Sequence, residues 1–303
     1  MIGDVRALLT CPVCGSGFPV TPAGPPPQAL RCANGHSFDI ARQGYVNLLP
    51  GGARPGTADT AEMVAAREAF LSAGHYAPLA AGVAALAAAA WPRPEGPARP
   101  CVLDAGAGPG YYLAAVLDRL RGPQGGADGP GGVGGTEAAG LAMDISARAL
   151  RRAARARPGI GAVVWDVWRP FPVRDGAVSL ILNVFAPRNG PEFRRVLRAD
   201  GALIVVTPGP RHLAELAGRA GLLAVDTRKD ERVEATLGAS FALAGTRDLT
   251  VPLRLTRPEA AALVAMGPAA RHTDPGAVRE RLAAAPEPIG ATAAFRLSHY
   301  RPA

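Results

Sequence analysis

The stretch Val102-Leu103-Asp104-Ala105-Gly106-Ala107-Gly108-Pro109-Gly110 decides the fold of this chain. It joins a short apolar segment, which begins at Cys101, to a turn that contains three glycines. Glycine adopts backbone conformations that other residues avoid, and it lets a ligand approach the main chain closely. The apolar segment predicts a buried strand, Cys101 to Asp104, and the residues from Tyr111 to Arg121 predict a helix. The stretch therefore indicates the first strand–turn–helix of a ligand-binding α/β domain.

Alternating strands and helices continue after this turn. Further strands are expected at Gly140–Met143, Ala162–Trp165, Val178–Phe185 and Ala202–Thr207, and helices at Ser146–Arg157 and Pro191–Arg198. Weaker patterns predict an antiparallel strand at Thr250–Thr256 and a last strand at Phe295–Tyr300. This alternation predicts an α/β fold with a doubly wound, mostly parallel, Rossmann-like sheet, whose ligands bind at the carboxyl ends of the strands.

The residues of the glycine turn favour S-adenosylmethionine over a dinucleotide. A pyrophosphate is bound by open backbone amides at a helix start, but Pro109 lacks an amide hydrogen and Tyr111 and Tyr112 crowd this entry. S-adenosylmethionine carries no phosphate, so these residues do not oppose it. The residues assigned to this donor in the turn are Asp104, Gly106, Gly108 and Gly110.

Acidic residues also follow the next two expected strands. Asp144 ends the second strand, where it would accept hydrogen bonds from a ribose, and Asp166 ends the third, where it would accept one from an adenine amine. Acidic residues are common in solvated loops, and Asp166 alone would fit that interpretation. Together with Asp104, however, they form a series at three successive strand ends, which favours a donor site.

Two polar residues follow the fourth and fifth strands. Asn183, in Asn183-Val-Phe-Ala-Pro187, offers a hydrogen-bond donor and an acceptor to the edge of a nucleobase, or it simply ends a buried strand. His212, in Thr207-Pro-Gly-Pro-Arg-His-Leu213, could line the pocket, act as a base or cap the next helix. We take Asn183 and Asp166 as the candidate catalytic residues.

A metal-binding pattern lies near the N-terminus. Cys11-Pro-Val-Cys14 and Cys32-Ala-Asn-Gly-His36 are two short ligand pairs with the spacing of a zinc ribbon. Three thiolates and one imidazole fill all four tetrahedral positions of Zn²⁺, so the ion would be structural and could not activate water. The predicted ligands are Cys11, Cys14, Cys32 and His36. The chemistry of the protein is therefore expected at the glycine turn.

Composition sets broad limits on the partners. The 303 residues carry a net charge of +8, and Lys229 is the single lysine among 33 basic residues. A GC-rich genome would produce this composition, but arginine also binds phosphate and stacks on bases. The arginines between Arg148 and Arg157 allow the same two interpretations, a solvated helix face or a binding surface.

The N-terminal residues lack the apolar core of a signal peptide, and the apolar run Ala81 to Trp91 is too short to span a bilayer. We therefore expect a cytoplasmic protein with no membrane partner. Between the ribbon and this apolar run, Asp59 to Leu79 predicts one helix. After the expected helix Tyr111 to Arg121, the glycine-rich residues Gly122 to Ala139 predict a surface insertion.

Several sequence blocks, taken together, resemble a known family. The chain is similar to the bacterial 23S rRNA (guanine-N1)-methyltransferases, which include the macrolide (tylosin) resistance methyltransferases of actinomycetes. The matching blocks are the two ligand pairs, Phe38-Asp-Ile-Ala-Arg-Gln-Gly-Tyr-Val-Asn-Leu-Leu-Pro50, Ala61 to Arg67, Phe70-Leu-Ser-Ala-Gly-His-Tyr76, the Gly106 turn with Tyr111-Tyr112, and Thr207 to Leu213.

The resemblance implies methylation of N1 of a guanine in a 23S rRNA hairpin loop, with tylosin-type resistance as its consequence and a homodimer as a possible assembly. It implies donor contacts from Tyr76, Tyr112, Leu113 and His212. It also implies three units: a zinc ribbon at 1–50 that selects RNA, a connector at 51–100 that contributes to the donor pocket, and a methyltransferase domain at 101–303. One alternative is a small-molecule methyltransferase with a structural ribbon. Another is a non-catalytic RNA-binding protein, which is disfavoured because the residues expected to bind the donor are all present, namely Asp104, Gly106, Gly108, Gly110 and Asp144.

Overall fold

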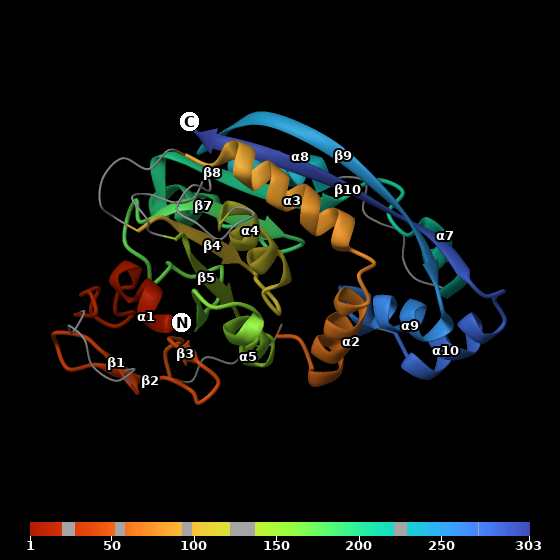
Figure 1. The fold of residues 1–303 in the computed structure, drawn as a ribbon, viewed down its shortest axis with the longest axis horizontal. Helices are drawn as coiled ribbons and strands as arrows, with labels where there is room; N and C mark the ends of the chain where they lie inside the picture. Colours follow the sequence, from red (N-terminus) through yellow and green to blue (C-terminus); the bar gives the residue numbers. More distant parts are fainter. Residues whose placement is uncertain (20–27, 52–57, 93–98, 122–136, 221–228, 272) are drawn as a thin grey trace.

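A single eight-stranded sheet forms the centre of the protein, in the order β3-β6-β5-β4-β7-β8-β10-β9 (Figure 1). The computed structural model describes residues 1–19, 28–51, 58–92, 99–121, 137–220, 229–271 and 273–303. The strands of this sheet are β3 (Tyr45–Asn47), β4 (Cys101–Ala105), β5 (Ala139–Asp144), β6 (Ile160–Val164), β7 (Val178–Val184), β8 (Leu197–Pro208), β9 (Phe241–Leu255) and β10 (Ile289–Pro302).

The direction of the strands confirms the expected fold class. All neighbouring pairs from β3 to β8 are parallel, whereas β10 is antiparallel to both β8 and β9. β9 and β10 extend well beyond the predicted Thr250–Thr256 and Phe295–Tyr300, because they pair with each other over almost their whole length. Parallel order places the ends of β4, β5 and β7 at one edge, where the glycine turn lies.

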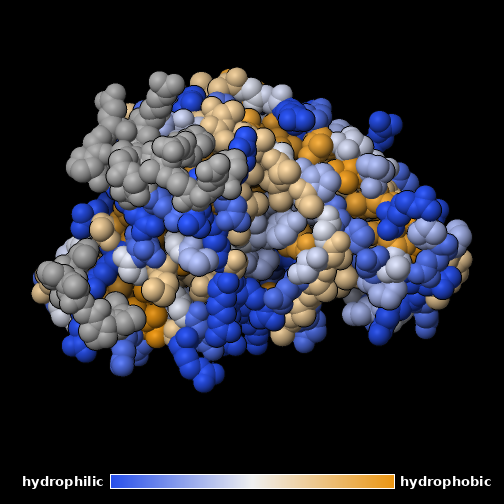
Figure 2. Space-filling model, in the orientation of Figure 1, coloured by the Kyte–Doolittle hydropathy of each residue, from blue (hydrophilic) through white to orange (hydrophobic). Residues whose placement is uncertain are grey.

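Helices pack on both faces of the sheet. They are α1 (Ile2–Val5), α2 (Ala61–Ser72), α3 (Ala77–Ala90), α4 (Tyr111–Arg121), α5 (Ala147–Ala156), α6 (Gly190–Val196), α7 (Ala214–Ala220), α8 (Lys229–Leu237), α9 (Arg257–Ala265) and α10 (Pro275–Ala283), with 3₁₀ turns at Arg6–Leu8 and Pro268–Arg271. Local chemistry fixes several helix starts: the Ser146 hydroxyl caps α5, and Thr256 with Glu259 forms a capping box at α9. Hydrophilic side chains gather on the surface over α5 (Figure 2).

Alternating residues of the central strands supply two separate cores. In β7, Leu180 and Leu182 pack in the core with α3 and α4, whereas Ile181 packs in the other core with α6. This period of two is the pattern of a strand buried on both faces. The second core also contains Phe18 and Leu30 of the N-terminal ribbon, so the ribbon covers part of one sheet face.

The ribbon is joined to the sheet by backbone as well as by side chains. Its hairpin consists of β1 (Ala29–Arg31) and β2 (Ser37–Asp39), and the following strand β3 pairs in parallel with β6. Thr10 donates its amide hydrogen to Pro172 O at 3.0 Å, and Arg174 donates to Leu8 O at 2.9 Å. The sheet thus begins within residues 1–50, before the expected end of the ribbon.

The single helix expected from Asp59 to Leu79 is wrong, because the chain turns between α2 and α3. Gly74 adopts a φ of +83° there, a conformation that glycine reaches without strain, and its amide donates to Leu71 O. The two helices bend away from each other by 83°, and α2 packs beside α9, which itself contacts α10 (Figure 1). Most of the insertion expected at Gly122–Ala139, residues 122–136, lies outside the described residues.

Among the described residues, no single helix has the length and apolar composition to cross a membrane. Within these described ranges, α2 and α3 meet both criteria only when they are taken together as one segment, and the 83° bend separates them.

Candidate active site and metal centre

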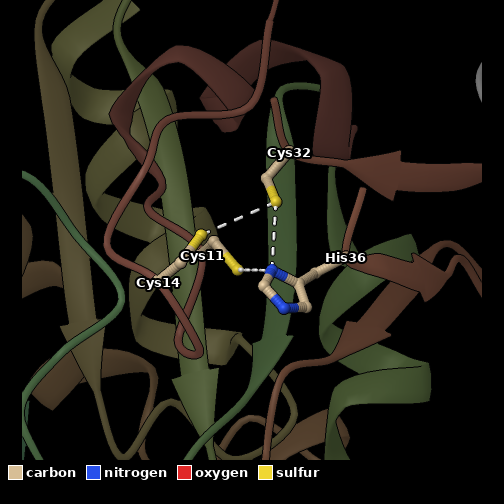
Figure 3. A group of neighbouring side chains, drawn as sticks. All are labelled: Cys11, Cys14, Cys32 and His36. Atoms are coloured by element: carbon tan, nitrogen blue, oxygen red, sulfur yellow. Dashed lines mark hydrogen bonds between the residues drawn. The ribbon is translucent and has the colours of Figure 1, made fainter. Parts of the chain in front are cut away.

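The four predicted zinc ligands come together in the ribbon. Cys11 and Cys14 lie on the first turn, and Cys32 and His36 lie on either side of the second, with all four ligand atoms within 4.8 Å of one another (Figure 3). Cys14 Sγ lies 3.7 Å from Cys32 Sγ, and His36 Nδ1 lies 3.4 Å from Cys32 Sγ and 3.7 Å from Cys11 Sγ. Tetrahedral Zn²⁺ separates such ligand atoms by roughly 3.6–3.8 Å, so this donor set fits zinc.

Two glycine turns shape the metal site. Gly15 has a φ of +72° and donates to Cys11 O, and Gly35 has a φ of +82° and donates to Cys32 O. These turns direct the side chains of each pair toward the same point. A hydrogen bond with the Ser16 hydroxyl lowers the pKa of the Cys14 thiol to about 5, which favours the thiolate that binds metal. The site therefore serves to hold the ribbon together.

A separate cavity of about 660 Å³ lies at the carboxyl ends of β4, β5, β7 and β8. Most of the residues predicted to bind the donor line it: Tyr76, Asp104, Gly106, Gly108, Tyr112, Asp144 and His212. The structure therefore brings residues separated by more than one hundred positions to a single site. Its volume falls within the range of pockets for small molecules and cofactors.

Asp144 organises the glycine turn. Its Oδ2 accepts a hydrogen bond from Gly108 N at 2.9 Å, and its Oδ1 accepts one from Ser146 N at 2.7 Å. Gly106 also donates its amide hydrogen to Met143 O, one residue before Asp144. Because each carboxylate oxygen can accept two hydrogen bonds, Asp144 can also accept from a ribose in the cavity.

Asp104 is a buried carboxylate beside the cavity. Its side chain is 1% exposed, and neither carboxylate oxygen has a hydrogen-bond partner among the described residues. Burial, together with the nearby Asp144, raises the pKa of Asp104 to about 8. A buried carboxylate without a partner is costly, and a cationic ligand would remove that cost. S-adenosylmethionine carries an ammonium and a sulfonium group, so the residues of the cavity fit this donor.

Two other donor predictions fall outside the cavity lining. Leu113 is fully buried in the core beneath the turn. Gly110 has a φ of +81°, and a Cβ there would lie 3.0 Å from Ala153 Cα, so its small size allows α4 to approach α5. Both residues support the turn by packing.

The two candidate catalytic residues are also absent from the cavity lining. Asn183 is completely buried, and its Nδ2 donates to Ala105 O at 3.1 Å and to Pro187 O at 2.8 Å. It therefore links the glycine turn to the loop after β7. Asp166 accepts a hydrogen bond from Trp168 N at 3.0 Å and closes a local turn after β6.

An aromatic wall forms the side of the cavity next to β7 and β8. Phe185 is 42% exposed, and its ring centroid lies 6.4 Å from that of Tyr112 and 6.5 Å from that of His212. Phe185 and Leu213 adopt φ values of 55° and 56°, and they are the only non-glycine residues with positive φ in the described chain. Such strain is concentrated at functional sites, and here both residues line this one cavity.

His212 is fixed within this wall. Its Nδ1 lies 2.9 Å from Ala294 O, so Nδ1 carries a hydrogen and donates it, and Nε2 is the acceptor nitrogen of the neutral ring. The ring centroid of Phe295 lies 5.0 Å from that of His212.

Elements without a sequence motif close the cavity. Leu263, Val264 and Met266, in and after α9, also line it. Arg67 of α2 pairs with Asp59 and donates through Nη2 to Met266 O at 2.8 Å. The sequence of α9 carries no motif that indicates its place at the site, because contacts between residues 67 and 266 leave no local pattern.

The parallel sheet, the acidic residues at its strand ends and the cavity for a cationic donor define an α/β methyltransferase that carries a zinc ribbon. The family follows from sequence comparison. The zinc-ribbon family described as "RlmA, N-terminal" matches residues 9–54. The 23S rRNA (guanine(748)-N(1))-methyltransferase of Streptomyces fradiae is 44% identical to this chain and covers 93% of it and 92% of its own length.

Two further relatives carry the same type of name. A protein of Micromonospora griseorubida named for 23S rRNA guanine-N1 methylation is 53% identical over 99% of both chains. A Bacillus subtilis relative is 32% identical over 69% of this chain and 67% of its own. The chain therefore belongs to the 23S rRNA (guanine-N1)-methyltransferase family.

Proposed function

We propose that this protein transfers a methyl group from S-adenosylmethionine to N1 of a guanine in a hairpin loop of 23S rRNA. One observation carries the donor assignment: the carboxylate of Asp104 is buried and has no hydrogen-bond partner among the described residues. It lies beside the glycine turn, whose Gly108 amide donates to Asp144. The family supplies the acceptor: the Streptomyces fradiae relative is named for guanine 748, and we propose the equivalent guanine here.

The donor would lie across the carboxyl ends of β4 and β5. Asp104 would face its cationic amino acid portion, and Asp144 would accept from its ribose. When bound, S-adenosylmethionine supplies a methyl group activated by the positive sulfonium. Tyr76 of the connector and Met266 beyond α9 would cover the donor, since both line the cavity. The covered site excludes water and holds donor and acceptor in line, which supplies much of the rate.

The acceptor guanine would enter beside Phe185. A base inside a helix stem cannot reach a cavity, so the target must be unstacked, which costs least in a loop. The exposed ring of Phe185 would replace the lost stacking, because aromatic side chains stack on unpaired bases. Its strained backbone is consistent with this role, since φ near +55° turns the ring toward the cavity rather than continuing β7.

Guanine N1 carries a proton at neutral pH, and this proton must leave as the methyl group arrives. Nε2 of His212 is the basic atom that we assign to this step, because Nδ1 is already committed to Ala294 O. Asn183 would act indirectly, by holding Ala105 and Pro187 and thus the two loops that face donor and acceptor.

The remaining features of the proposal rest on the family. The zinc ribbon would help to select the hairpin, a homodimer would enclose it, and the protein would act in the cytoplasm. Methylation within the drug-binding tunnel would give resistance to tylosin-type macrolides.

The proposed function is tested with radiolabelled S-adenosylmethionine and three substrates in parallel: naked 23S rRNA, assembled large subunits and a metabolite extract. We expect label in one hairpin of the RNA or subunit. The Phe185→Ala variant should raise KM for RNA and lower kcat by a larger factor than it weakens donor binding, and Phe185→Trp should restore much of the loss. Label that enters only a small molecule would identify the protein as a small-molecule methyltransferase.

A further inference from the structure

A second, larger groove of about 1120 Å³ lies next to the donor cavity, between α2, α3, α4 and α5. Three residues, Leu71, Pro109 and Tyr111, line both spaces. The groove also includes Gln43, which lies in the ribbon between β2 and β3. It therefore extends from the ribbon to the rim of the donor cavity.

The two sides of the groove differ in chemistry. One side is basic and comes from α5 and the second half of α4. The other is formed by small apolar residues of α3 and the first half of α4. The basic residues are Arg119, Arg151, Arg152 and Arg155, and the small residues are Ala77, Ala80, Ala81, Ala84, Ala114 and Ala115. Figure 2 shows the hydrophilic surface over α5 from outside.

The positive charge of the groove is only partly neutralised from within. Its two acids are already paired: Glu68 contacts Arg152 at 2.6 Å, and Asp118 contacts Arg157, which lies outside the groove, at 2.5 Å. Arg151 and Arg155 are exposed and form no ion pair with any described residue. An anionic ligand would therefore meet guanidinium groups that need no competing contact to be broken.

We propose that this groove binds a single strand of RNA that flanks the target nucleotide, an inference that rests on the proposed function. The arginines would contact the phosphates, while riboses and unpaired bases would lie against the alanines. Single-stranded nucleic acids are bound by this combination of a cationic track and an apolar surface. A duplex keeps its bases covered and would leave the alanine side without a partner. The groove thus carries the strand from the ribbon to the methyl donor.

The test is a pair of double variants with equal loss of charge. Arg151→Ala with Arg155→Ala removes two cations of the groove that form no ion pair with a described residue, and Arg247→Ala with Arg254→Ala removes two exposed arginines of β9 that do not line the groove. RNA affinity is measured for the isolated hairpin by fluorescence anisotropy at several salt concentrations. The groove variant should bind the RNA roughly tenfold more weakly. A plot of the logarithm of its binding constant against the logarithm of the salt concentration should have a slope that is shallower by about 0.7 for each lost phosphate contact.

A third variant tests the apolar side. Ala81 is exposed on α3, so Ala81→Glu keeps the fold and places a negative charge where the strand would lie. It should weaken RNA binding at least as much as the groove variant. All three variants should bind S-adenosylmethionine as the unmodified protein does, because none of these residues lines the donor cavity.

The outcomes separate the two proposals. If the unmodified protein methylates the RNA and the groove and Ala81 variants bind it with unchanged affinity and salt dependence, the groove proposal is wrong and the proposed function stands. If the β9 variant loses as much RNA affinity as the groove variant, arginines contribute to RNA binding wherever they lie on the surface, and the groove has no special role. If the unmodified protein neither binds nor methylates the RNA, the proposed function itself fails.

Discussion

Asp104→Asn should have opposite effects on the stability of the donor-free protein and on donor binding. The pKa of Asp104 is raised from 3.8 to about 8 by burial and by Asp144. Burial raises the pKa of Asp144 as well, although hydrogen bonds from the amides of Ser146 and Gly108 oppose part of that shift. The folded protein therefore keeps a proton on Asp104 that the unfolded chain releases above its ordinary pKa. Stability is lost as pH rises between about 4 and 8.

The size of this effect follows from the shift. Each pKa unit corresponds to about 1.4 kcal/mol, so the penalty reaches at most about 4 kcal/mol at pH 7. Asparagine keeps the shape of the side chain but cannot ionise. The variant should therefore exceed the unmodified protein in unfolding free energy by an amount that grows by about 1.4 kcal/mol for each pH unit from 5 to 7.

Donor binding should change in the other direction. Asparagine offers no negative charge to the cationic donor, and a hydrogen bond to a charged group contributes about 1.5–3 kcal/mol, which is roughly 10- to 150-fold in affinity. In the unmodified protein the donor should favour ionised Asp104, so affinity should rise from pH 6 to pH 8. Affinity of the variant should remain constant over this range.

Urea unfolding at pH 5, 6 and 7 measures the stability of both proteins without donor, and titration calorimetry from pH 6 to 8 measures donor affinity. A stability difference that does not change with pH would show that Asp104 is ionised in the folded protein. Equal donor affinity of the two proteins would show that Asp104 does not face the donor cation. Either result would refute the reasoning from its burial.

Three other substitutions test the site. Cys14→Ser should abolish stoichiometric zinc, measured by mass spectrometry, and lower the Tm, because the ribbon shares a core with the sheet; retained zinc would contradict the ligand set. Asp144→Ala should weaken donor binding by roughly 1–3 kcal/mol in calorimetry, with no competition by NAD; tight NAD binding would contradict the donor assignment. Gly106→Ala places a Cβ 2.3 Å from Ala186 Cβ at a φ of +89°, so donor binding should be lost; an unchanged affinity would show that the turn tolerates the shift.

The parallel core could be predicted because its signals are local. Apolar runs such as Val178 to Phe185 predict buried strands, and short helices between them require parallel order. The same order places Asp104 and Asp144 at one edge, so their meeting follows from the pattern. The zinc ligands were equally predictable, because the geometry of the ion fixes their spacing.

Other parts of the site depend on contacts that sequence does not show. The turn at Gly74 depends on one positive φ, and α9 reaches the cavity through tertiary packing. Asn183 has the chemistry to bind a base, but its amide donates to two backbone carbonyls instead. Phe185 is an ordinary strand residue in the sequence, and only its backbone conformation reveals it as part of the cavity wall.

The most direct measurement is primer extension on 23S rRNA from a host that lacks this modification, with and without expression of this protein. A methyl group on N1 blocks the Watson–Crick edge, so reverse transcriptase should stop at one guanine. We expect this to be the guanine proposed above, equivalent to guanine 748, for which the Streptomyces fradiae relative is named. Mass spectrometry of that fragment should show one methyl group on guanine. Unmodified guanine at full expression, or a methyl group on another atom, would contradict the account.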